Sequence, residues 1–119
     1  MDRHRTQRVV LLDDDQDFRT ALAANLEDDG YAVDQFGRPA DVSLPAMARP
    51  LMLIVDYQLH GEDGLAFADR FHAAYPDVPV LMVTAYWNAV LDAEVAARDF
   101  VTLRRKPIDY DELASLLPA

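Results

Sequence analysis

The chain is a series of short apolar runs, each followed by a stretch in which apolar residues recur at helical spacing. Three of the runs lack the polar alternation of a half-exposed strand, namely Val9–Leu12, Leu51–Val55 and Val78–Val83. Continuous apolar strands of this kind are typical of a parallel sheet that is covered on both faces. Because parallel strands need a crossover connection, usually a helix, the pattern predicts an α/β fold.

Two weaker strands are expected as well, one at Tyr31–Phe36 near an edge of the sheet and one at Phe100–Leu103. Helices are expected at Asp17–Glu27, Pro39–Ala48, Leu65–Ala74, within Trp87–Ala97, and at Tyr110–Leu117. Pro45 interrupts the second of these, so we expect that helix to be short or distorted. Five strands, each followed by a helix, predict a mostly parallel sheet with right-handed crossovers in a single domain over residues 1–119.

Composition and charge narrow the class of protein. The 119 residues include no cysteine and carry a formal net charge of -10. The lack of cysteine argues against a disulfide framework, and no apolar run has the length of a signal-peptide core or a membrane span. We therefore expect a cytoplasmic protein with no membrane partner and, given the acidic charge, no direct nucleic-acid partner. Residues 1–7 are expected to be a frayed N-terminal arm.

Polar residues gather where the predicted strands end. Asp13 and Asp14 follow the first strand in the stretch "VVLLDDD", and Asp56 follows the third. Thr84 follows the fourth strand, and Lys106, the only lysine of the chain, follows the fifth. Because the carboxyl ends of parallel strands meet at one edge of an open sheet, we expect these five side chains to converge there.

The chemistry of this set is coherent. Crowded carboxylates repel one another, so the triple aspartate either lies in open water as a turn or binds a cation. Carboxylate oxygens suit Mg²⁺, and a neighbouring carboxylate can attack phosphorus to form an aspartyl phosphate. Thr84 and Lys106 can then donate hydrogen bonds to the phosphoryl oxygens.

Four stretches in this order resemble the receiver domains of two-component response regulators. They are "VVLLDDDQDF", "LMLIVDYQLHGEDGL", "VLMVTAYW" and "RRKPID", and together they span nearly the whole chain. The resemblance implies a doubly wound, flavodoxin-like fold whose five-stranded parallel sheet has the order 2-1-3-4-5 and is flanked by about five helices.

The resemblance also implies roles for acidic residues. Asp56 matches the phosphoacceptor, and Asp13 and Asp14 match the metal-binding acid pair. The backbone carbonyl that completes the family's metal site falls on Gln58. The implied cofactor is Mg²⁺, with Mn²⁺ as a possible substitute.

The remaining matches concern the phosphoryl group and the partners. Thr84 matches the switch hydroxyl, with the small Ala85 beside it, and Lys106 matches the active-site lysine, which the family commonly joins to its proline, here Pro107, by a cis peptide bond. The implied phosphodonor is a sensor histidine kinase or a phosphotransfer protein, and a homodimer is possible. The resemblance implies that the protein is not an enzyme. It implies a phosphoacceptor that assists its own phosphorylation and dephosphorylation.

Three alternatives stay open at this point. Asp13 and Asp15 have the spacing of the nucleophile motif of haloacid-dehalogenase-like phosphatases. Leu103 stands where the family usually has an aromatic residue, which keeps a non-phosphorylated pseudo-receiver possible. A flavodoxin-like FMN binder would share the sheet, but no glycine-rich phosphate loop follows the first strand. We interpret Tyr57, Tyr75 and Tyr110 as packing residues rather than chemical groups.

Overall fold

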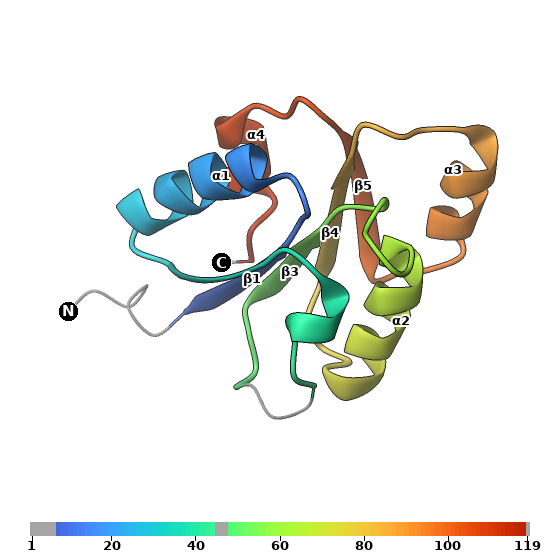
Figure 1. Cartoon of the computed structure of the whole chain (residues 1–119), viewed down its shortest axis with the longest axis horizontal. Coiled ribbons are helices and arrows are strands. Elements are labelled where there is room, and N and C mark those ends of the chain that lie inside the picture. Colours follow the sequence, from blue (N-terminus) through green and yellow to red (C-terminus); the bar gives the residue numbers. More distant parts are fainter. Residues whose placement is uncertain (1–6, 45–47, 119) are drawn as a thin grey trace.

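The computed structural model describes residues 7–44 and 48–118, and its core is one parallel sheet (Figure 1). The sheet has five strands in the order β2-β1-β3-β4-β5. The strands are β1 (Arg8–Leu12), β2 (Ala32–Phe36), β3 (Met52–Val55), β4 (Val80–Thr84) and β5 (Val101–Arg105). The predicted fold class and strand order are therefore confirmed, and the weakly apolar β2 does lie at an edge of the sheet.

Helices cover both faces of the sheet. They are α1 (Gln16–Asp28), the 3₁₀ helix η2 (Pro39–Asp41), α2 (Gly64–Ala74), α3 (Ala89–Ala96) and α4 (Tyr110–Ser115). In Figure 1, α1 and α4 lie on one side of the sheet, and α2 and α3 lie on the other. Among the described residues, none of the helices combines the length and the apolar character needed to span a membrane.

The helix expected at Pro39–Ala48, short or distorted, is represented in the described residues by one short 3₁₀ helix. Among the described residues of this range only η2 forms, because the backbone becomes extended at Val42, with φ −93° and ψ 122°. Pro45, the residue expected to disturb the helix, lies outside the described residues, as does most of the expected N-terminal arm. The structure thus has four α-helices and one 3₁₀ helix in its described part, close to the expected five.

Alternate residues of β1 enter two different cores, which explains why the strand is apolar throughout. Val9 and Leu11 pack with the buried side chains of α1 and α4, whereas Val10 and Leu12 pack with those of α2 and α3. Successive side chains of a strand point to opposite faces. A strand between two helical layers therefore needs an apolar residue at every position, as the sequence pattern predicted.

Three helices begin with a side-chain cap at the edge of the sheet where the strands end. Asp15, Asp63 and Asn88 each accept a hydrogen bond from the backbone amide three residues further on, at 3.1, 2.7 and 2.8 Å. Such a cap typically contributes about 1 kcal/mol to the stability of its helix. The caps therefore help to hold the three loops that follow β1, β3 and β4.

Candidate functional site

Three carboxylates meet at the carboxyl ends of β1 and β3. Asp13 and Asp14 directly follow β1, and Asp56 directly follows β3, which pairs with β1 in parallel. One oxygen from each of the three side chains lies within 4.8 Å of the others. Asp13 is only 1% exposed and Asp56 8%, whereas Asp14 is exposed. Two of the three charges are thus removed from water.

Lys106 lies between the two buried carboxylates. Its Nζ atom is 2.8 Å from Asp13 Oδ2 and 2.9 Å from Asp56 Oδ2. The Lys106 backbone amide donates to the Thr84 carbonyl at 2.9 Å, which continues the pairing of β5 with β4 and positions the side chain at the sheet edge. The peptide bond between Lys106 and Pro107 is cis.

Burial and charge oppose each other in this cluster. Burial raises the pKa of Asp13 above its ordinary value, even though Lys106 and the Asp15 amide act in the other direction. For Lys106, burial acts to lower the pKa, but the hydrogen bonds to Asp13 and Asp56 outweigh it and the pKa is raised. The lysine is therefore held in its ammonium form between two acidic groups.

Thr84 is the last residue of β4 and is fully buried. Its Oγ1 atom accepts a hydrogen bond from the Tyr86 backbone amide at 3.1 Å. Ala85, between them, is exposed. The structure therefore brings the predicted hydroxyl to the same sheet edge as Lys106, with its oxygen already engaged by the loop that follows β4.

The loop after β3 approaches Asp56 closely. The Gln58 amide donates to Asp56 Oδ1 at 3.2 Å, whereas a metal-binding role of the Gln58 carbonyl stays a prediction. A Cβ atom added at Gly64 would lie 2.1 Å from the Asp56 carbonyl oxygen, so any larger residue there would displace the backbone. The Gly64 amide also donates to the Tyr57 carbonyl at 2.6 Å. Gly64 thus fixes the backbone around Asp56.

Two further residues contact the acidic loop but were not predicted from the sequence. The Arg19 guanidinium, on α1, donates to the Asp13 carbonyl at 2.6 Å. His60 Nε2 lies 3.5 Å from Asp14 Oδ2. Neither contact has a recognisable sequence spacing, because each depends on how a loop folds over the edge of the sheet.

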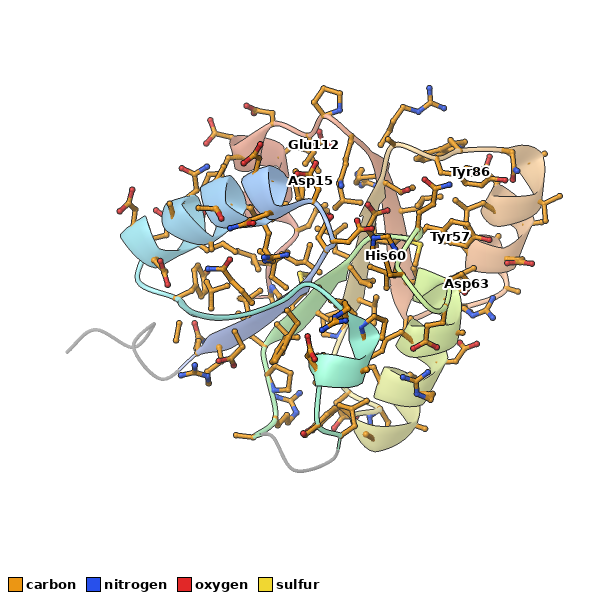
Figure 2. The ribbon with its side chains drawn as sticks, viewed as in Figure 1. Asp15, Tyr57, His60, Asp63, Tyr86 and Glu112 are labelled. Carbon is orange, nitrogen blue, oxygen red and sulfur yellow. The ribbon has the colours of Figure 1, made fainter. Side chains whose placement is uncertain are left out.

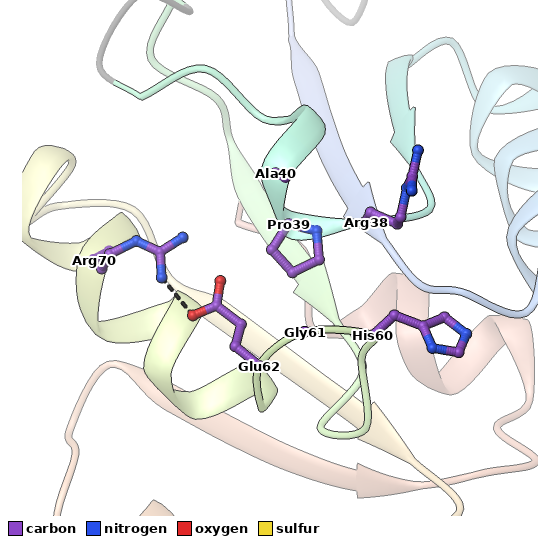
Figure 3. A pocket seen from close by; sticks show the side chains of 7 residues that line it. All are labelled: Arg38, Pro39, Ala40, His60, Gly61, Glu62 and Arg70. Atoms are coloured by element: carbon purple, nitrogen blue, oxygen red, sulfur yellow. Dashed lines mark hydrogen bonds and ion pairs between the residues drawn. The ribbon is translucent and has the colours of Figure 1, made fainter.

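A shallow pocket of about 290 Å³ lies beside this edge (Figure 3). It is lined by Arg38, Pro39, Ala40, His60, Gly61, Glu62 and Arg70. Its basic groups are already paired with acidic ones: Arg70 contacts Glu62 at 2.5 Å, and Arg38 lies 3.8 Å from Asp41. None of the clustered carboxylates lines the pocket, so the chemistry belongs to the exposed edge of the sheet instead.

The cluster suits a divalent cation. Three carboxylates and one ammonium leave two negative charges in excess. Mg²⁺ and Mn²⁺ prefer oxygen ligands, and Mg²⁺ needs only one or two carboxylates with retained water and phosphate oxygens. The exposed Asp14 leaves this side of the cluster open to solvent. The arrangement can therefore place a carboxylate, a cation and hydrogen-bond donors around one phosphoryl group.

Comparison with protein families and curated proteins points in one direction. A family model described as the response regulator receiver domain matches residues 9–117. The nitrogen assimilation regulatory protein NtrX of Azorhizobium caulinodans is 34% identical over 112 residues, a match covering 88% of this chain and 24% of that protein. The DNA-binding transcriptional regulator NtrC of Escherichia coli K12 is 34% identical over 113 residues, covering 92% and 24%. The chain thus spans about a quarter of the length of these relatives.

Solved structures share the fold over nearly the whole chain. A response regulator protein from Burkholderia pseudomallei superimposes with a TM-score of 0.84 at 23% identity, covering 95% of this chain and 67% of that one. The chemotaxis protein CheY4 of Vibrio cholerae gives a TM-score of 0.79 at 25% identity, covering 92% and 93%.

Proposed function

Because this chain belongs to the response regulator receiver domain family, we propose that it accepts a phosphoryl group on Asp56 from a histidine kinase or phosphotransfer protein. Phosphorylation then switches a face that binds a downstream partner. The observation that carries the proposal is the buried Asp56 carboxylate, held 2.9 Å from Lys106 beside a second buried aspartate. Residues 1–119 form one receiver domain in this proposal, which acts in the cytoplasm.

The proposed transfer balances as follows for a phosphohistidine donor. An oxygen of the Asp56 carboxylate attacks phosphorus, and a P–O bond forms as the P–N bond breaks. The electron pair of the broken bond stays on the imidazole nitrogen, which then takes up a proton. With acetyl phosphate the bond that breaks is P–O and acetate leaves. In either case Asp56 itself supplies the nucleophile, so the chain is its own phosphoryl acceptor.

The other polar groups hold the transferred phosphoryl group. The Lys106 ammonium exchanges part of its contact with Asp56 for a phosphoryl oxygen, and the Thr84 hydroxyl donates to another. Asp13, Asp14, Asp56 and the Gln58 carbonyl would hold Mg²⁺, or Mn²⁺ in its place. When bound, the cation neutralises charge on the phosphoryl oxygens. Arg19 supports this set by holding the Asp13 carbonyl.

The phosphatase alternative finds less support. Its second aspartate is Asp15, whose carboxylate is engaged as the cap of α1 and accepts from the Phe18 amide at 3.1 Å. The family model that matches the chain is also that of receiver domains.

Whether the whole protein binds DNA is a separate question. The relative NtrC is named a DNA-binding regulator, which is not in line with our expectation of no nucleic-acid partner, but this chain matches only about a quarter of that protein.

The test is intact mass spectrometry after incubation with acetyl phosphate and Mg²⁺. We expect the wild-type chain to gain the mass of one phosphoryl group and the nearly isosteric Asp56→Asn to gain none, with an unchanged circular dichroism spectrum. Asp15→Asn is the matched control and should be modified like the wild type. Label that persists in Asp56→Asn and maps by peptide analysis to Asp13 or Asp15 would favour the phosphatase instead.

A further inference from the structure

Two tyrosines stack on each other beside the proposed phosphorylation site. The rings of Tyr57 and Tyr86 are 5.3 Å apart between centroids and inclined by 17°, and Figure 2 shows Tyr86 above Tyr57 close to α3. Tyr57 directly follows Asp56, and Tyr86 lies two residues beyond Thr84. The stack therefore joins the loop of the phosphoacceptor to the loop of the buried hydroxyl.

Tyr57 is held by a backbone contact and by the core. Its carbonyl accepts the Gly64 amide at 2.6 Å, and Gly64 approaches the Asp56 carbonyl so closely that no Cβ atom would fit between them. Its ring also packs against the buried core between the sheet and α2. Tyr57 thus provides a packed surface on which the Tyr86 ring rests.

Tyr86 lies at a junction of three contacts. Its backbone amide donates to Thr84 Oγ1 at 3.1 Å, and its ring rests on Tyr57. Its hydroxyl accepts a hydrogen bond from Asn88 Nδ2 at 2.5 Å. Asn88 is the cap of α3, because its Oδ1 accepts from the Leu91 amide at 2.8 Å. A displacement of Tyr86 therefore acts on the first turn of α3.

We propose that the stacked Tyr57–Tyr86 pair couples Thr84 to the start of α3, so that a phosphoryl group on Asp56 loosens the first turn of that helix. This coupling rests on the function proposed above. When Thr84 turns its hydroxyl toward a phosphoryl oxygen, its oxygen moves away from the Tyr86 amide, which then has to find another acceptor. The peptide shifts, the Tyr86 ring slides on Tyr57, and the hydroxyl releases Asn88 from its capping position.

Leu103 explains why such a route is needed. It is half-buried and packs against the same core cluster as Tyr57 and Tyr86. A leucine at this position has neither a hydroxyl nor a ring to carry a signal from Thr84 to β5. The tyrosine pair has both a hydroxyl and rings, and it lies in the loops that follow β3 and β4. It therefore reaches α3 rather than β5.

The test measures amide hydrogen exchange at Leu91 with and without beryllofluoride and Mg²⁺, with occupancy of Asp56 followed by fluorine NMR. We expect exchange at Leu91 in the wild type to become at least about fivefold faster with the phosphoryl mimic, the size that loss of one helix cap supports. Tyr86→Phe keeps the ring but loses the hydroxyl. In this variant the Leu91 amide should exchange fast both with and without the mimic, so the ratio of the two rates should be close to one. Tyr57→Leu removes the surface on which the Tyr86 ring rests and should also reduce the ratio.

Tyr110→Phe is the matched control, since it makes the same chemical change on α4, where the hydroxyl donates to Asp29 at 2.7 Å. It should keep the wild-type ratio. A wild-type ratio in Tyr86→Phe and Tyr57→Leu, with Asp56 still occupied, would overturn the coupling and leave the phosphoacceptor function intact. A wild-type chain that neither binds the mimic nor takes up a phosphoryl group would overturn that function and the coupling together.

Discussion

Lys106 reaches across the sheet edge to form an ion pair with Asp13, with Nζ 2.8 Å from Oδ2. The contact joins residues that are 93 positions apart in the sequence, from the ends of β1 and β5, which are not neighbours in the sheet. The same ammonium also contacts Asp56. One cationic side chain thus partly compensates two buried carboxylates, and the exposed Asp14 has no share in it.

Mg²⁺ should stabilise the folded chain, because a cation that binds only the folded state relieves the remaining carboxylate repulsion. At a concentration about 100 times the Kd, the gain is about 2.7 kcal/mol, which raises the melting temperature by several degrees. Asp13→Asn and Asp14→Asn should each reduce the gain in a thermal unfolding experiment. Asp77→Asn, at an exposed position in a distant loop, is the control; equal gains in all four proteins would place the cation elsewhere.

Lys106→Arg should separate charge from shape. The guanidinium keeps the positive charge but is planar and larger than the compact ammonium, which fits between two carboxylate oxygens. We expect phosphorylation of Asp56 by acetyl phosphate to survive, as measured by intact mass, while the conformational response beyond the site is lost. A normal response in Lys106→Arg would show that only the charge is required.

The single tryptophan should report the response of the loop after β4. Trp87 precedes the cap of α3, and its Nε1 donates to Asp92 Oδ2 at 3.1 Å. The Arg105 guanidinium carbon lies over the Trp87 ring, 4.9 Å from its centroid. A shift of this loop changes both contacts, so beryllofluoride with Mg²⁺ should change Trp87 emission. The change should vanish in Asp56→Asn and shrink in Thr84→Ala.

An unchanged emission spectrum in a sample whose Asp56 is shown by mass to be modified would contradict this expectation. The loop would then not respond to phosphorylation, and the face that meets the downstream partner would lie elsewhere on the domain.

The ion pair between Asp69 and Arg98 should make a small contribution to stability that is lost in acid. Two hydrogen bonds from Arg98, at 2.8 and 2.9 Å, lower the pKa of Asp69. A lowered pKa stabilises the fold above the ordinary aspartate pKa of about 3.9, and the stabilisation is lost as the pH falls through the lower folded-state value.

Because the Asp69 side chain is 48% exposed, we expect at most about 1 kcal/mol at pH 7 after screening by solvent. Urea unfolding of wild type and Asp69→Asn should therefore differ at neutral pH and converge at a pH below both pKa values of Asp69. A difference that persists unchanged at that pH would mean that packing, rather than charge, accounts for it. Asp77→Asn again serves as the control.

Part of the site could be predicted because it depends on local order along the chain. A residue that directly follows a buried parallel strand must lie at the carboxyl edge of the sheet, so Asp13, Asp56 and Thr84 could be placed there without a structure. The extent of η2 could not, because short helical turns depend on contacts with the rest of the fold more than on propensity.

The sequence by itself determined the layers of this protein and the edge at which its polar groups gather. This was possible because local patterns of apolar and charged residues predict which strands are buried and where they end. Only the tertiary structure decided which of those groups touch. The bridge from Lys106 to Asp13 and the stack of Tyr57 on Tyr86 each join separate loops. Such contacts depend on the twist of the sheet and on the path of each loop, so they cannot be predicted from the spacing of residues along the chain.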